Sequence, residues 1–154
     1  MKLKAVERAD FRSYKKPAMR LVLPDYCYTD ASGIKHFSKN ADIDVFKLIT
    51  SYVLDDVVKA VVFDGTEPFD SYEDIKYFIK KFREITDDTI IIYSQYDECA
   101  LEKQLEELSQ YSNIIVKFGK MLCDSSRSMI YDDVLGVVLS SDNQYAKEIS
   151  KSPQ

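Results

Sequence analysis

The stretch AVVFDGTEPF, residues 60–69, decides the fold that this sequence predicts. Its first four residues are all apolar, and a continuous apolar run is typical of a strand buried on both faces of a sheet. The next residues, 64–69, contain glycine and proline and predict a loop. Asp70 and Glu73 then have the spacing of a capping box, which predicts that a helix begins there.

The same order of strand, loop and helix recurs along the chain. Apolar runs predict further strands, and apolar residues three or four apart predict helices. The predicted strands cover 19–23, 89–93, 113–118 and 134–139; the predicted helices begin at Asp42 or Asp44 and at about Asp97, with a short one over 142–149. Residues 25–41 and 120–133 are predicted to be irregular. Alternating strands and helices indicate an α/β fold with a mainly parallel sheet of about five strands.

The composition suits one soluble domain. The chain has 154 residues, of which 45% are hydrophobic, enough to build a core. No apolar stretch approaches the roughly 18 residues of a membrane helix, and the N-terminal segment has no apolar run typical of a secretion signal. We therefore expect a cytoplasmic protein that does not contact membranes.

Charge is distributed unevenly. Residues 1–20 hold seven Lys/Arg and two Asp/Glu (+5), whereas the other residues hold 14 basic and 24 acidic ones (−10), which together give the net charge of −5. We expect residues 1–17 to form a basic arm ahead of a single domain over residues 18–150. The arm is either a solvated segment or a contact for nucleic acid or an acidic partner. The acidic domain disfavours direct nucleic-acid binding elsewhere.

Cysteine usage leaves two interpretations open. Cys27, Cys99 and Cys123 are odd in number and far apart, so they do not form a disulfide framework and are most simply reduced thiols. Alternatively, the three thiols and the single histidine, His36, converge on zinc, which accepts three cysteines and one histidine.

Several short motifs together resemble the radical S-adenosylmethionine activating proteins, the group that includes the activase of anaerobic ribonucleotide reductase and short phage and bacterial members. The loop 64–68, DGTEP, resembles the Gly-Gly-Glu-Pro motif of that family. The other motifs are YKKPAM (14–19), EPFDS (67–71), KFG (117–119), DVLG (133–136) and SDNQYA (141–146). The resemblance spans residues 6–150 and implies a shortened, open (β/α) partial barrel.

The resemblance also implies a site. In that family three cysteines spaced C-x3-C-x2-C follow the first strand and hold a [4Fe–4S] cluster, which binds and cleaves S-adenosylmethionine. Here Cys27 stands at the first of these positions, and Ala31 and Ile34 occupy the other two. A pocket for S-adenosylmethionine would be retained by Gly65, Thr66, Glu67 and Tyr93.

These observations favour a function without catalysis. Iron–sulfur clusters need several thiolates, so the loss of two ligands predicts a degenerate radical S-adenosylmethionine enzyme with no cofactor. We expect a protein that binds and inhibits another protein, such as a basic nucleic-acid-guided nuclease in phage counter-defence of the anti-CRISPR type. The alternative is a working activase of a glycyl-radical enzyme with an unusual [4Fe–4S] site. A third hypothesis is a pocket that binds S-adenosylmethionine or a nucleotide without reacting.

Overall fold

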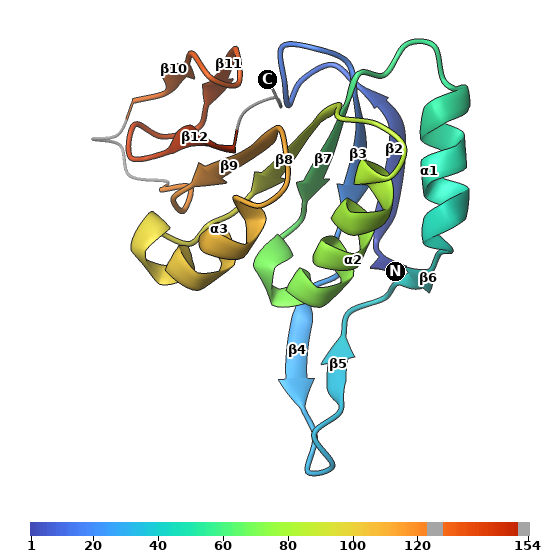
Figure 1. Cartoon of the computed structure of the whole chain (residues 1–154). Helices are drawn as coiled ribbons and strands as arrows, with labels where there is room; N and C mark the ends of the chain where they lie inside the picture. The colour runs from blue at the N-terminus through green and yellow to red at the C-terminus, as the bar shows by residue number, and fades with distance from the viewer. Residues whose placement is uncertain (123–127, 151–154) are drawn as a thin grey trace.

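The computed structural model describes residues 1–122 and 128–150, and a six-stranded mixed sheet lies at its centre (Figure 1). Its four middle strands are parallel and follow the order of the sequence: β3 (Ala18–Val22), β7 (Ala60–Asp64), β8 (Thr89–Tyr93) and β9 (Ile114–Phe118). Antiparallel strands form the two edges: β2 (Ala5–Asp10) beside β3, and β12 (Tyr145–Ser150) beside β9. The α/β class is thereby confirmed.

The middle strands are buried on both faces, as their apolar runs predicted. Successive side chains of a strand point to opposite faces of the sheet. Phe63 and Ile92 accordingly belong to the core cluster on one face, whereas Val62 and Ile91 belong to the cluster on the other, and all four are completely buried. Both faces of the sheet therefore exclude water along these strands.

Three helices cover one face of the sheet (Figure 1). They are α1 (Val45–Leu54), α2 (Tyr72–Arg83) and α3 (Glu102–Leu108), and short 3-10 turns, η1 (Pro68–Ser71) and η2 (Glu98–Leu101), precede the last two. In the described part of the chain the opposite face carries no helix and is covered by Tyr14, Leu135 and Leu139. The helices that connect the parallel strands therefore all lie on the same side of the sheet.

The helix starts were predicted with mixed success. Asp44, one of two predicted caps, does cap α1, because its carboxylate accepts a hydrogen bond of 2.7 Å from the amide of Phe46. The capping box of Asp70 and Glu73 was wrong. Ser71 stands before α2 without a side-chain cap, and the carboxylate of Asp70 instead accepts a hydrogen bond from the Tyr96 hydroxyl at 2.8 Å.

Three two-stranded sheets surround the main one. β1 (Lys2–Leu3) pairs with β6 (Ala41–Asp42), β4 (Tyr26–Thr29) with β5 (Lys35–Phe37), and β10 (Ile130–Asp132) with β11 (Val137–Leu139). The β4–β5 hairpin projects away from the body of the protein (Figure 1). The prediction of irregular structure for residues 25–41 was wrong, because strands β4 and β5 pair there as a hairpin. The hairpin begins directly beyond β3, where the predicted cluster loop would lie.

Both ends of the chain differ from their predictions. Residues 1–17, expected to form an arm, supply β1 and β2, and Arg12 of this segment pairs with Glu7 and Asp10. Residues 142–149, predicted to be helical, form most of β12, because pairing with β9 places Ala146 in the core. Residues 134–139 were predicted to be a strand of the main sheet, but only 137–139 are extended, and they pair with β10.

None of the helices within the described ranges combines the length and the apolar character that crossing a membrane requires.

Candidate functional site

A pocket lies at the carboxyl ends of the parallel strands, where ligands bind in sheets of this kind. It has a volume of about 550 Å³ and is lined in part by Asp64 and Gly65 at the end of β7, by Tyr93 and Gln95 at the end of β8, and by Lys117 of β9. Gly65 and Tyr93, two of the four predicted pocket residues, therefore line this pocket.

Gly65 shapes the loop because no other residue fits its place. Its φ of +128° is one that side chains rarely adopt. A Cβ added there would lie 2.7 Å from the carbonyl oxygen of Leu23. The loop after β7 thus approaches the end of β3 backbone to backbone, and this contact sets one wall of the pocket.

Asp64 brings a charge to the pocket that the structure already neutralises. Its Oδ2 accepts a hydrogen bond from Arg20 Nε at 3.0 Å and forms an ion pair with Arg20 Nη2 at 2.8 Å. Arg20 also pairs with Glu7 at 3.0 Å. Arg20 is thus shared between Glu7 and Asp64, so the carboxylate of Asp64 has a cationic partner within the protein.

Glu67 is buried beside the pocket but does not line it. Its side chain accepts hydrogen bonds from the amides of Phe69 (2.9 Å) and Gln95 (2.7 Å) and from the Ser94 hydroxyl (2.9 Å). The residue is 7% exposed. Burial raises the pKa of its carboxyl, whereas each of the three hydrogen bonds lowers the pKa by a smaller amount. Glu67 therefore fastens the loop after β7 to the end of β8, and both of its oxygens have protein partners.

Thr66 lies on the outside of the same loop. Its side chain is hydrogen-bonded to Asp25, and its carbonyl oxygen accepts a hydrogen bond from the Gln95 side chain. Thr66 is exposed and is not a lining residue of the pocket. Of the predicted set, Gly65 and Tyr93 come together at the pocket, and Thr66 and Glu67 hold the loop behind it.

Tyr93 and Lys117 form the floor of the pocket. The Tyr93 hydroxyl donates to the carbonyl oxygen of Ser13, and burial raises the pKa of this phenol. Lys117 is 5% exposed and its Nζ donates to the carbonyl oxygen of Gly119 at 3.0 Å. Burial lowers the pKa of the Lys117 ammonium, while Asp64 and Glu67 act in the opposite direction.

Lys117 is one of several lining residues of this pocket that reasoning from sequence missed. It stands in the run IIVKF, residues 114–118, where a charged residue interrupts an otherwise apolar strand. A lysine inside such a buried strand is uncommon unless its ammonium has a partner. This single charged residue in an apolar strand was the signal from which the role of Lys117 could have been predicted.

Cys27 lies on the projecting hairpin, away from any group of metal ligands. Its thiol is exposed and lies 3.7 Å from the carbonyl oxygen of Asp25. Within residues 1–122 and 128–150, no three His, Cys, Asp or Glu side chains come together in a way that could hold a metal ion. Cys99 and His36 therefore do not join Cys27 in a site, and Cys123 lies outside the described residues.

The donors that the described residues offer do not fit a [4Fe–4S] cluster. Such a cluster needs several thiolates, and the place beyond β3 supplies Cys27 alone. His36 faces Asp30 instead, with Nε2 2.9 Å from Oδ2, and its ring stacks on Tyr28.

No protein-family model, curated protein or solved structure matches this chain. The resemblance to radical S-adenosylmethionine activating proteins therefore remains a prediction from the motifs.

Proposed function

We propose that this protein is a non-catalytic descendant of a radical S-adenosylmethionine activating protein and acts by binding and inhibiting a protein partner. One observation carries the proposal: the segment beyond β3, where the resemblance places the cluster ligands, is a projecting hairpin with a single thiol. A projecting hairpin can enter a concave surface of another protein, whereas one thiol cannot hold a cluster.

The side chains of the hairpin suit an interface. Tyr28 is 56% exposed and Ile34 is 59% exposed, so both offer apolar area to a partner. Exposed tyrosine is favoured at protein interfaces, since its ring buries a large area and its hydroxyl stays hydrated.

The hairpin is also ordered in advance. Oδ1 of Asp30 accepts hydrogen bonds from the amides of Ser32 (2.8 Å) and Ile34 (3.0 Å), which fix the turn. The stacked rings of Tyr28 and His36, 4.6 Å apart between centroids, hold the two strands together. A preformed binding segment loses little conformational entropy when it binds.

We propose, further, that the sheet is a shortened, open relative of the (β/α) barrel. The four parallel strands lie in sequential order with their helices on one face, the arrangement that one arc of such a barrel would have. The antiparallel strands β2 and β12 end the arc on both sides.

The net charge of −5 favours a basic target. We propose a basic nucleic-acid-guided nuclease in the cytoplasm of a phage host, which this protein would inhibit as part of counter-defence. The hairpin would occupy a groove that normally holds nucleic acid.

The test measures binding and inhibition across a panel of purified nucleic-acid-guided nucleases. We expect one of them to be bound and inhibited, and expect the double substitution Tyr28→Ala and Ile34→Ala to weaken that binding at least tenfold. Tyr77→Ala is the matched control, because Tyr77 is also an exposed tyrosine but lies on α2. Equal loss with the control, or an absence of binding across the panel, would contradict the proposal.

Iron content after anaerobic purification separates this proposal from the activase alternative. The proposal predicts protein without stoichiometric iron. Four iron atoms per chain together with reductive cleavage of S-adenosylmethionine would establish the enzyme instead.

The pocket beside Asp64, Tyr93 and Lys117 favours a second candidate, the binding of a small ligand without chemistry. Its volume of about 550 Å³ is within the range of small-molecule sites. Calorimetry with S-adenosylmethionine and with nucleotides tests this candidate. The absence of heat at millimolar ligand would remove it.

A further inference from the structure

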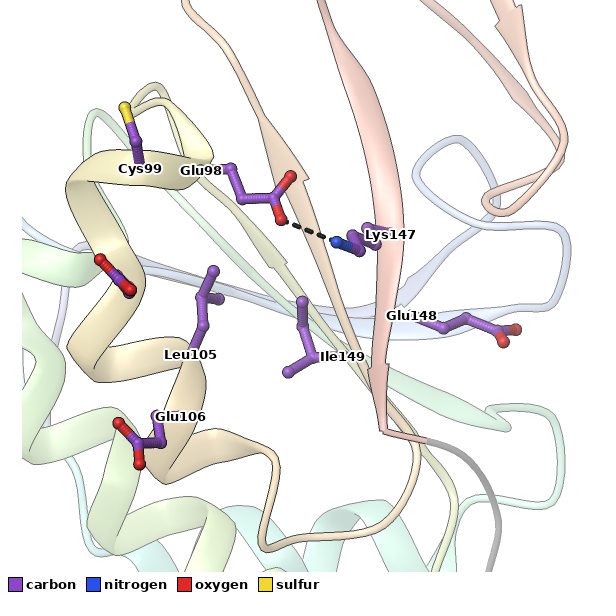
Figure 2. A pocket seen from close by; sticks show the side chains of 8 residues that line it. Glu98, Cys99, Leu105, Glu106, Lys147, Glu148 and Ile149 are labelled. Carbon is purple, nitrogen blue, oxygen red and sulfur yellow. Dashed lines mark hydrogen bonds and ion pairs between the residues drawn. The ribbon is translucent and has the colours of Figure 1, made fainter.

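A second hollow lies on the helical side of the sheet, between α3 and the edge strand β12 (Figure 2). It has a volume of about 780 Å³. Leu105 of α3 and Ile149 of β12 point toward one another across it (Figure 2). Both side chains are half-buried and pack against the main core, so their outer surfaces form an apolar floor.

The topology explains why this hollow exists. The helices α1, α2 and α3 follow β3, β7 and β8 and cover this face of the sheet. After β9 the described chain forms the β10–β11 hairpin and β12 instead of a further helix. The helical side of β12 therefore lacks the cover that the other strands have, and the hollow lies next to α3.

Carboxylates form the rim of this hollow on its α3 side. Glu98, Glu102 and Glu106 follow one another at four-residue intervals, which places them along one side of the helical segment. Glu98 is engaged within the protein, because its carboxylate pairs with Lys147 at 2.8 Å (Figure 2). It also accepts a hydrogen bond from the Tyr145 hydroxyl at 2.8 Å.

Glu102 and Glu106 offer negative charge to a partner. Over the ranges 1–122 and 128–150, neither carboxylate takes part in an ion pair or a side-chain hydrogen bond. Like charges at this spacing on a helix repel each other. Positive groups bound between them would relieve that repulsion.

We propose that this hollow binds an amphipathic helix of a partner protein, with an apolar stripe flanked by Lys or Arg at four-residue intervals. The apolar stripe would cover Leu105 and Ile149, and the basic residues would pair with Glu102 and Glu106. The helix would take the place beside β12 where the described residues supply no helix of their own. This surface is separate from the β4–β5 hairpin, so its test does not depend on the hairpin.

The experiment uses a synthetic, fluorescently labelled helical peptide of roughly 18 residues, or five turns. It carries leucine along one stripe and lysine at four-residue intervals on the flanks; a second peptide carries glutamate in place of every lysine. Fluorescence anisotropy measures the affinity of each peptide for the full chain.

The variant Glu102→Lys with Glu106→Lys reverses the rim charge. Asp56→Lys with Asp133→Lys is the matched control, because both aspartates are exposed, lie outside the hollow and change the net charge equally. We expect the rim variant to bind the lysine peptide at least tenfold more weakly, and the control variant to change affinity less than twofold. Circular dichroism verifies that both variants are folded.

The glutamate peptide should bind the wild-type protein at least tenfold more weakly than the lysine peptide and gain affinity for the rim variant. Equal binding of the two peptides, or an equal effect of the rim and control variants, would overturn the proposal. A dimer of the wild-type chain that dissociates on rim reversal would overturn it in favour of a second copy as the occupant.

Discussion

Replacing Gly65 by alanine tests how the loop after β7 is held against the end of β3. The new Cβ would lie 2.7 Å from the carbonyl oxygen of Leu23 and 3.2 Å from its amide nitrogen, and both of these are backbone atoms that cannot rotate away. The φ of +128° adds a second cost, because a side chain is strained there. Backbone strain of this kind is worth about 1–3 kcal/mol, and overpacking adds about 1–3 kcal/mol.

Gly33→Ala is the matched control for this prediction. Gly33 also has a positive φ, +82°, but a Cβ added there meets nothing within 4 Å. The control therefore carries the backbone strain without the collision. We expect Gly65→Ala to lower the free energy of unfolding by about 2–6 kcal/mol and Gly33→Ala by about 1–3 kcal/mol.

Urea denaturation followed by circular dichroism measures this difference. With a slope of about 2 kcal/mol per molar urea, an extra loss of ~2 kcal/mol lowers the midpoint by roughly 1 M. If Gly65→Ala unfolds at the same urea concentration as Gly33→Ala, the close approach to Leu23 does not constrain the loop, and the reasoning fails.

Two further predictions concern buried polar groups. Burial raises the pKa of the Glu67 carboxyl in the folded protein above its value in the unfolded chain, so protonation of this carboxyl favours the folded state. The stabilisation is complete below about pH 4.5, and it disappears as the pH rises through the pKa of the folded protein. Between pH 4 and pH 8 the urea midpoint of the wild type should therefore fall relative to the midpoint of Glu67→Gln. Parallel curves for the two proteins would show that burial does not raise the pKa of this carboxyl. Tyr52→Phe removes the 2.6 Å hydrogen bond that the Tyr52 hydroxyl donates to Asp88. Burial raises the pKa of this hydroxyl, and we expect its removal to lower the free energy of unfolding by about 1.5–3 kcal/mol. Thermal unfolding measures this loss, with Tyr77→Phe at an exposed tyrosine as the control. Equal melting temperatures of the two variants would show that the hydrogen bond does not stabilise the fold.

The middle of the sheet was predictable because its signals are local. The apolar runs at 60–63 and 89–93 specify buried strands without reference to the rest of the chain. The strand β12 was not predictable in this way. Residues 145–150 alternate only weakly between polar and apolar, and they become a strand because Tyr145 and Ala146 pair with Phe118 and Lys117 of β9. Tertiary pairing here outweighs the local helical signal.

Two residues of the predicted site line one pocket, whereas the contacts of its other residues were not predictable from the sequence. The resemblance to radical S-adenosylmethionine proteins selected Gly65 and Tyr93, and both line a pocket at the carboxyl ends of the parallel strands. It could not show that Glu67 turns inward, because its partners Ser94 and Gln95 lie 27 and 28 residues further along the chain. The motif gives the kind of residue at this position, whereas its hydrogen-bond partners depend on the fold.

The placement of β2 and β12 on opposite edges of the sheet has a consequence for biosynthesis. Translation proceeds from the N-terminus, so β2 can pair with β3 while the later strands are still being made. The outer side of β9 has no neighbour until residues 145–150 leave the ribosome. A nascent chain paused before that point has β9 as an unpaired, apolar edge strand, and such an edge can pair with another chain.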